Sequence, residues 1–255
     1  MKLLIQRLAK SNIGIFFRNL IGFRPHRFTQ NYKFLNGISI SDGFPWRTDN
    51  GYKTKFKFSD ILGLFYKIEN SSVEIVFYSK DNKLIKRIII EELDYSNELI
   101  IDKDFLNGIQ SFGTFNIFHR SKGNYEDVIL SNRCYVGFSF NNNLSSFVHG
   151  NGYVKYKSLD GKKLHSGMVF SSLFTNLYRI QSTFLEFTKS ELFFVNPTSK
   201  KINFSVGKNS YHLEKGCSML IDVSGKEDIS IFSRCMFLRP IVFNYKNDFL
   251  DVYHT

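Results

Sequence analysis

The chain has 255 residues, of which 43% are hydrophobic, and it carries a net charge of +11. This apolar content is enough to bury one large β domain or two of ordinary size, which excludes a disordered chain. No apolar run reaches the roughly 18 residues of a membrane-spanning helix, so we do not expect an integral membrane protein. Ala9 is the only alanine, while Phe, Ile, Val, Tyr and Thr are abundant, which favours strands over helices.

The positive charge is concentrated at the N-terminus. Residues 1–41 contain no acid and seven basic residues, namely Lys2, Arg7, Lys10, Arg18, Arg24, Arg27 and Lys33. The rest of the chain holds 27 basic and 23 acidic residues, a net charge of only +4. A nucleic-acid-binding groove would need the basic surface to continue into the body of the protein, so nucleic acid is not an expected partner.

The segment from Lys2 to Phe23 is predicted to form a basic amphipathic helix that ends before Pro25. Its apolar side chains share one broad face, although Asn12 and Asn19 interrupt that face. Two interpretations compete. The helix lies on an anionic membrane surface through Lys2, Arg7, Lys10 and Arg18, or it packs on the β core of the same chain.

After Asn31 the hydrophobic period changes from helical to two. The alternation is cleanest from Tyr52 to Phe58, where three lysines alternate with Thr54, Phe56 and Phe58, and this lysine row suits the edge of a sheet. Residues 73–79 and 84–90 flank a polar turn and predict a β-hairpin. Further strands are predicted at residues 98–101, 114–119, 128–140 and 152–158.

The C-terminal part repeats this pattern of short strands and polar turns. Strands are predicted at residues 192–195, 202–206, 219–223, 229–232, 236–245 and 249–253. Residues 207–210 are predicted as a turn. Pro240 indicates an edge or a bulge. Residues 168–187 fit a helix about as well as a strand and are left open.

The expected fold is mainly β, with two antiparallel β-sandwich-like modules preceded by the helical segment. The expected boundaries are residues 1–30 for the helix, 31–160 for the first module and 161–255 for the second, although one continuous two-sheet fold also fits. Cys134, Cys217 and Cys235 show no CxxC spacing and are interpreted as reduced thiols, which indicates a cytoplasmic protein, peripheral to the inner membrane if the helix binds lipid.

No common catalytic or nucleotide-binding motif occurs in the sequence, and no cofactor is expected. The six histidines lack close ligand spacing, so no metal site is predicted. Asp102-Lys103-Asp104 follows a predicted strand, as in metal-binding DxD motifs, but the helices of a nucleotide-binding fold are missing and a solvated turn is preferred.

Two segments contain residue types that bind sugars. Residues 42–52, a predicted loop, combine Trp46, Arg47 and Asp49, and His149 and Asn151 flank a glycine in a polar stretch. An aromatic plane can cover the C–H face of a sugar while charged groups and amides pair with its hydroxyls. The alternatives are that Trp46 closes the end of a sandwich, that the aspartates cap turns, and that His149 stabilises a turn.

Five short stretches resemble uncharacterised bacterial proteins associated with surface-polysaccharide genes. They are Trp46-Arg47-Thr48-Asp49-Asn50, Asn132-Arg133-Cys134-Tyr135, Phe147-Val148-His149-Gly150-Asn151, Asn196-Pro197-Thr198-Ser199 and Asp251-Val252-Tyr253-His254. The resemblance covers most of the chain beyond Ser41. It implies a biological setting, and it assigns no catalytic residues.

The preferred hypothesis is a non-catalytic β protein that binds a carbohydrate, or a polysaccharide-biosynthesis protein, in envelope polysaccharide production. An enzyme acting on a sugar or sugar nucleotide is the first alternative, with carboxylates and His149 brought together from separate strands. A purely structural interaction module is the second. A deep pocket joining a histidine to carboxylates favours the enzyme, whereas a shallow aromatic shelf favours binding.

Overall fold

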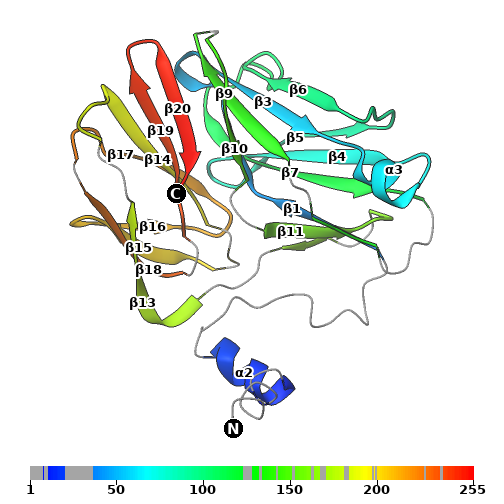
Figure 1. The fold of residues 1–255 in the computed structure, drawn as a ribbon, viewed down its shortest axis with the longest axis horizontal. Coiled ribbons are helices and arrows are strands. Elements are labelled where there is room, and N and C mark those ends of the chain that lie inside the picture. Colours follow the sequence, from blue (N-terminus) through cyan, green and yellow to red (C-terminus); the bar gives the residue numbers. More distant parts are fainter. Residues whose placement is uncertain are drawn as a thin grey trace.

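The computed structural model describes Leu8 and residues 11–20, 37–122, 128–131, 134–141, 143–150, 153–161, 164–166, 171–180, 184–196, 198, 200–226, 228–235 and 238–255. Within these ranges the protein is mainly β, as the sequence predicts, and its strands pair antiparallel except for one parallel pair, β1 with β8. Figure 1 shows two groups of strands, with the helix α2 (Asn12–Leu20) apart from them.

The N-terminal group consists of three four-stranded sheets, in the orders β12-β11-β1-β8, β10-β9-β3-β6 and β2-β7-β4-β5. The strands are β1 (Ile38–Asp42), β2 (Phe44–Arg47), β3 (Tyr52–Phe58), β4 (Ser72–Ser79), β5 (Leu84–Ile90), β6 (Asn97–Ile101), β7 (Phe112–Arg120), β8 (Ile129–Ser131), β9 (Tyr135–Phe140), β10 (Ser146–His149), β11 (Tyr153–Ser158) and β12 (Leu164–Ser166). A 3-10 turn η3 (Asp49–Gly51) precedes β3, and a short helix α3 (Ile61–Tyr66) follows it.

The C-terminal group is a two-sheet sandwich with the strand orders β13-β18-β15-β16 and β17-β14-β19-β20. The strands are β13 (Ser171–Ile180), β14 (Lys189–Val195), β15 (Ile202–Val206), β16 (Asn209–Leu213), β17 (Ser218–Asp222), β18 (Ile229–Cys235), β19 (Ile241–Lys246) and β20 (Phe249–His254). The sequence leaves residues 168–187 open between helix and strand. In the structure residues 171–180 of this segment form the strand β13. The predicted turn at 207–210 ends earlier, since β16 begins at Asn209.

The alternation predicted for β3 is confirmed, because Thr54, Phe56 and Phe58 are buried and the lysines face outward. The predicted edge position is wrong. β3 lies between β9 and β6, so its lysines are on an exposed face in the middle of a sheet. The strand predicted at 128–140 is also wrong as one element, because the chain leaves one sheet after β8 and enters another at β9.

The hairpin predicted at residues 73–90 is confirmed by the antiparallel pairing of β4 with β5. The predicted loop at 42–52 is wrong for its first half, since β2 pairs with β7. Pro45 lies in this strand, which is the edge of its sheet, where a missing N–H donor is tolerated. Pro240 lies just before β19 and outside it.

Serine side chains connect two sheets of the N-terminal group. The hydroxyls of Ser41 and Ser39 in β1 accept hydrogen bonds of 2.8 Å from the backbone N–H groups of Ile117 and His119 in β7. β2 pairs with residues 112–115 of β7. Farther along β7, the serine hydroxyls of β1 accept hydrogen bonds in place of the carbonyls of a neighbouring strand. Buried N–H groups are therefore satisfied without a continuous ladder.

The two groups of strands share a hydrophobic core. One buried cluster includes Phe56 and Phe138 from the N-terminal sheets and Phe193, Phe243 and Val252 from the C-terminal sandwich. Such continuity across the predicted boundary fixes the two groups together. The predicted boundary at 160/161 falls in the turn between β11 and β12, and β12 pairs with β11, so the N-terminal sheets extend to Ser166.

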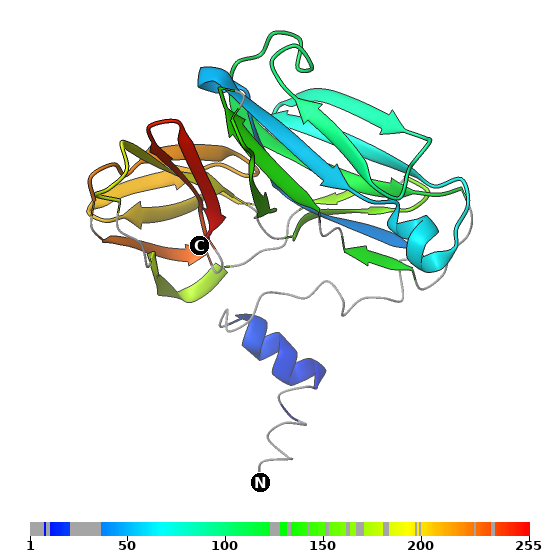
Figure 2. The same cartoon turned by 45° about the horizontal axis from the view of Figure 1, so that its top comes forward.

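β10 and β20 meet along this junction. The Ser146 hydroxyl accepts a 2.9 Å hydrogen bond from the Val252 N–H, and the Asn143 side chain donates to the Asp248 carbonyl at 2.7 Å. In Figure 2 the red hairpin that ends in β20 lies against the green strands of the N-terminal group. The amide of Asn82 adds a second contact by donating to the Lys215 carbonyl at 3.2 Å.

The C-terminal histidine makes this junction sensitive to acid. Burial lowers the pKa of His254; a hydrogen bond with the Thr255 carbonyl opposes this shift, while the nearby charges of Arg239 and His149 add to it. In the unfolded chain the pKa is about 6.5. Because the unfolded chain takes up the proton first, the stability that His254 contributes above pH 6.5 is lost as the pH falls below that value.

We therefore predict that His254→Gln reduces the loss of unfolding free energy between pH 7.5 and pH 5.5. The difference from the native chain cannot exceed about 1.4 kcal/mol per pH unit, the limit for one proton. Urea titrations at the two pH values measure it. His212→Gln, at an exposed position of β16, is the control. An identical pH dependence in the native and His254→Gln chains contradicts the prediction.

Candidate functional site

Trp46 is a buried residue at the sheet edge. Its side chain is fully buried, and the indole Nε1 donates a 2.9 Å hydrogen bond to the Tyr78 carbonyl. Gly113 makes room for this contact, because a Cβ there would lie 2.8 Å from the indole nitrogen. The ring therefore offers no free face for a sugar, and its position favours the alternative that Trp46 closes the end of a sheet stack.

Arg47 is also fully buried, and its guanidinium group binds two carboxylates. Nη2 lies 2.7 Å from Asp49 Oδ2, and Nη1 lies 2.8 Å from Glu191 Oε2 on β14 of the other group. The guanidinium also lies over the rings of Tyr52 and Phe243, at 4.1 and 4.9 Å from their centroids. This cluster, which we call the Arg47 cluster, is an internal connection between the two groups of strands.

Electrostatics keep the Arg47 cluster charged. Burial alone would lower the pKa of Arg47, but the hydrogen bond to Asp49 and the surrounding negative charges raise it above its ordinary value. The Tyr245 hydroxyl donates to Glu191 at 3.1 Å, and burial raises the pKa of this phenol above its ordinary value. Trp46, Arg47 and Asp49, which the sequence predicts as sugar contacts, therefore make their contacts within the protein.

His149 lies elsewhere, exposed on the outer face of β10, and Asn151 is outside the described residues. The five predicted ligand contacts therefore do not form one site in the described structure. Four basic residues are predicted at the membrane surface. Lys2, Arg7 and Lys10 lie outside the described residues, and so does the side chain of Arg18.

Around His149 the structure assembles an aromatic and basic surface that we call the platform. It is the outer face of the sheet β10-β9-β3-β6, whose inner face is buried in the core. Cross-strand pairing aligns two rows on it. One row is His149, Tyr135, Lys57 and Glu98; the other is Phe147, Gly137, Lys55 and Ile100.

The aromatic side chains of the platform lie close to the sheet. The rings of Tyr135 and His149 are 4.6 Å apart between centroids, with 40° between their planes. Phe147 covers Gly137, where an added Cβ would come within 2.6 Å of its ring. Tyr135 remains 49% exposed and Phe147 39% exposed. Part of each aromatic surface is therefore open to a flat ligand.

Three lysines on β3 give the platform its positive charge. Lys57 Nζ lies 5.3 Å from the centroid of the Phe147 ring, within cation–π distance. Glu98 pairs with Lys55 at 3.3 Å and with Lys57 at 3.6 Å, while Lys53 lies farther along the same outward face. One carboxylate thus pairs with two ammonium groups, which leaves a net positive charge on this part of the platform.

A second feature is a polar groove near the end of β7. Its volume is about 940 Å³, and its lining includes Arg120, Lys122, Glu69, Glu91, Glu92 and Asp160. Beneath it, the buried Glu74 carboxylate binds Lys157 at 2.6 Å and Arg87 at 2.5 Å, with Arg120 at 3.8 Å. Among the described residues no histidine lines this groove, so they do not supply the combination that the enzyme hypothesis requires.

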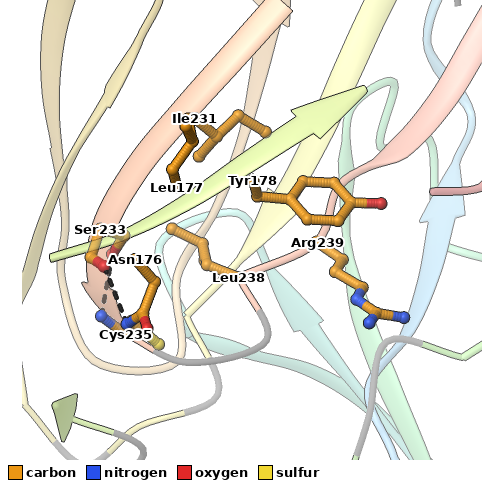
Figure 3. A pocket seen from close by; sticks show the side chains of 8 residues that line it. All are labelled: Asn176, Leu177, Tyr178, Ile231, Ser233, Cys235, Leu238 and Arg239. Carbon is orange, nitrogen blue, oxygen red and sulfur yellow. Dashed lines mark hydrogen bonds between the residues drawn. The ribbon is translucent and has the colours of Figure 1, made fainter. Parts of the chain in front are cut away.

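The C-terminal sandwich contains a smaller cleft of about 180 Å³ between β13, β18 and the turn after it (Figure 3). Arg239 lies 5.6 Å from the Tyr178 ring at one end of the cleft, and Cys235 lies at the other. Burial raises the pKa of the Cys235 thiol to about 12, so it is not a nucleophile at neutral pH. This cleft is below the roughly 300 Å³ of small-molecule sites.

The cysteines and the acidic residues add no further site. Cys134, Cys217 and Cys235 form no disulfide within the described structure. Across the described residues, no group of three or more His, Cys, Asp or Glu side chains has a metal-binding arrangement. No helix in the described structure has the length and apolar character to cross a membrane.

No protein-family model matches the chain, and no curated protein matches it.

The Arg47 cluster generates a stability prediction. We expect Arg47→Met to lower the free energy of unfolding by about 3 kcal/mol, because it leaves Glu191 and Asp49 without their shared cation at a buried position. Adding Glu191→Gln should recover part of this loss. Urea denaturation measures both effects, and Arg179→Met on the exposed side of β13 should change stability by less than about 0.5 kcal/mol. A similarly small loss for Arg47→Met would contradict the prediction.

A second prediction concerns Gly137. In Gly137→Ala the new Cβ forces the Phe147 ring away from the sheet, and because that ring is partly exposed we expect stability to change by less than about 1 kcal/mol. The ring-current shift of the Lys57 side-chain methylenes should decrease in NMR spectra. Unchanged Lys57 resonances would show that the ring does not depend on this glycine.

Proposed function

We propose that this chain is a non-catalytic carbohydrate-binding β protein and that its ligand is an acidic glycan bound on the platform. The observation that supports this most directly is the Phe147 ring, packed against Gly137 with Lys57 nearby. Aromatic planes cover the apolar C–H faces of sugar rings, and lysines pair with carboxylate or phosphate substituents. Both chemistries occur here within one flat surface.

The shape of the platform suits an extended ligand. It spans four neighbouring strands, about 14 Å at the usual strand spacing. Tyr135 and Phe147 lie on adjacent rows, so one chain of sugars can contact both rings in succession. A flat shelf of this kind is the outcome that favours binding over catalysis.

The charge balance favours a glycan over a nucleic acid. Single-stranded nucleic acids are bound by strongly positive grooves that follow the phosphate backbone. On the platform Glu98 already neutralises part of the charge of Lys55 and Lys57. The chain beyond residue 41 has a net charge of only +4. A glycan with widely spaced acidic groups matches this moderate positive charge better.

The enzyme alternative has weaker support. His149 stacks against Tyr135, and within the described part of the chain the ion pairs include none between His149 and a carboxylate. The carboxylates of the polar groove lie beside Arg120 without a histidine. The proposed link to envelope polysaccharide production, with a biosynthesis protein as the other partner, depends on the sequence resemblance alone.

Binding is tested with polygalacturonate as an acidic probe and dextran as a neutral one, using affinity electrophoresis of the full chain. We expect retardation by polygalacturonate and none by dextran. Phe147→Ala should weaken binding about tenfold, the factor that corresponds to one lost ring contact of about 1.4 kcal/mol. Lys57→Ala should weaken it and reduce its dependence on salt.

Phe249→Ala is the matched control, since that ring is 78% exposed at the start of β20 and away from the platform rows. Its binding should equal that of the native chain. The proposal is wrong if Phe147→Ala and Phe249→Ala bind equally well, if dextran binds as well as polygalacturonate, or if a single-stranded oligonucleotide displaces the glycan at lower concentration. If new reducing ends appear in the incubated glycan, the protein is an enzyme that cleaves the glycan and not only a binding protein.

A further inference from the structure

The helix α2 presents apolar side chains that no described part of the protein covers. Ile13 is 71% exposed, Phe16 63% and Phe17 58%. These positions are spaced i, i+3 and i+4, so they form one face of the helix. The Phe16 and Phe17 rings contact each other edge to face at 5.7 Å. An exposed apolar face of this kind marks an interaction surface.

The start of α2 is fixed by its own sequence. The Ser11 hydroxyl accepts a 3.1 Å hydrogen bond from the Gly14 N–H, which is the N-cap arrangement, and the helix begins at Asn12. The predicted start at Lys2 lies outside the described residues, of which Leu8 is helical. The exposed fractions of Ile13, Phe16 and Phe17 show that this face of α2 does not pack on the described part of the β core.

We propose that α2 docks on an anionic membrane surface with the face formed by Ile13, Phe16 and Phe17. The charge of this segment favours an anionic membrane as the partner of α2, since residues 1–41 carry seven basic residues and no acid. Basic residues next to an apolar helical face are attracted to anionic headgroups while the aromatic rings enter the interface. Docking brings the β modules to the membrane without using the platform.

The test is co-sedimentation of the full chain with vesicles of phosphatidylglycerol and phosphatidylcholine, compared with pure phosphatidylcholine vesicles. We expect binding to the anionic vesicles and much weaker binding to the neutral ones. Phe16→Ser combined with Phe17→Ser should lower the partition coefficient at least about tenfold. Arg7→Gln combined with Lys10→Gln should lower it about tenfold on anionic vesicles only.

Phe249→Ser is the control, because it removes an exposed ring, 78% accessible, from the C-terminal sandwich. It should partition like the native chain, and circular dichroism confirms that each variant is folded. Equal partitioning of the double phenylalanine variant overturns the proposal, as does equal binding to neutral vesicles. A concentration-dependent dimer that the same variant abolishes, without vesicle binding, would assign the face to a second copy. Glycan binding by the platform is measured separately and does not depend on these outcomes.

Discussion

The buried guanidinium of Arg47 is the constraint on which the arrangement of the two groups of strands depends. A cation without solvent access is tolerated only where carboxylates and hydrogen bonds compensate the lost hydration, and here Glu191 of the other group supplies one of them. Separating the groups would break the Arg47–Glu191 ion pair and leave Arg47 with Asp49 and Glu191 with Lys189. The shared hydrophobic core holds the groups together, and this ion pair specifies the relative position in which they meet.

β3 transmits this constraint to the platform. On its inner side the Thr54 hydroxyl accepts from the Arg47 N–H at 2.8 Å and donates to the Arg47 carbonyl at 2.9 Å. On its outer side the same strand carries the lysines that flank the Phe147 ring. Because side chains alternate along a strand, one β-strand both contributes to the junction and carries the lysines of the platform. At the far edge of the sheet, β10 is fixed by its contacts with β20.

The sequence predicts local alternation well and distant partners poorly. The pattern of β3 and the hairpin of β4 and β5 follow from period-two hydrophobicity, which acts within a few residues. Arg47 was expected to be accessible, because its compensating Glu191 lies 144 residues away and no local signal reveals it. The edge position predicted for the lysine row of β3 is wrong because its partner strands are also distant in the sequence. β6 and β9 lie about 40 and 80 residues after β3.

The platform was within reach of a closer sequence argument. Burial of Val136, Phe138 and Val148 directs Tyr135, Gly137, Phe147 and His149 to the opposite face once β9 and β10 are paired. A glycine opposite the outward Phe147 then has a physical reason, because only a residue without Cβ lets this ring pack against the backbone. The charged residues divide in the same way. Arg47 and Lys157 pair with carboxylates inside the fold and position its sheets, whereas Lys55 and Lys57 share one carboxylate on the outer face of β3.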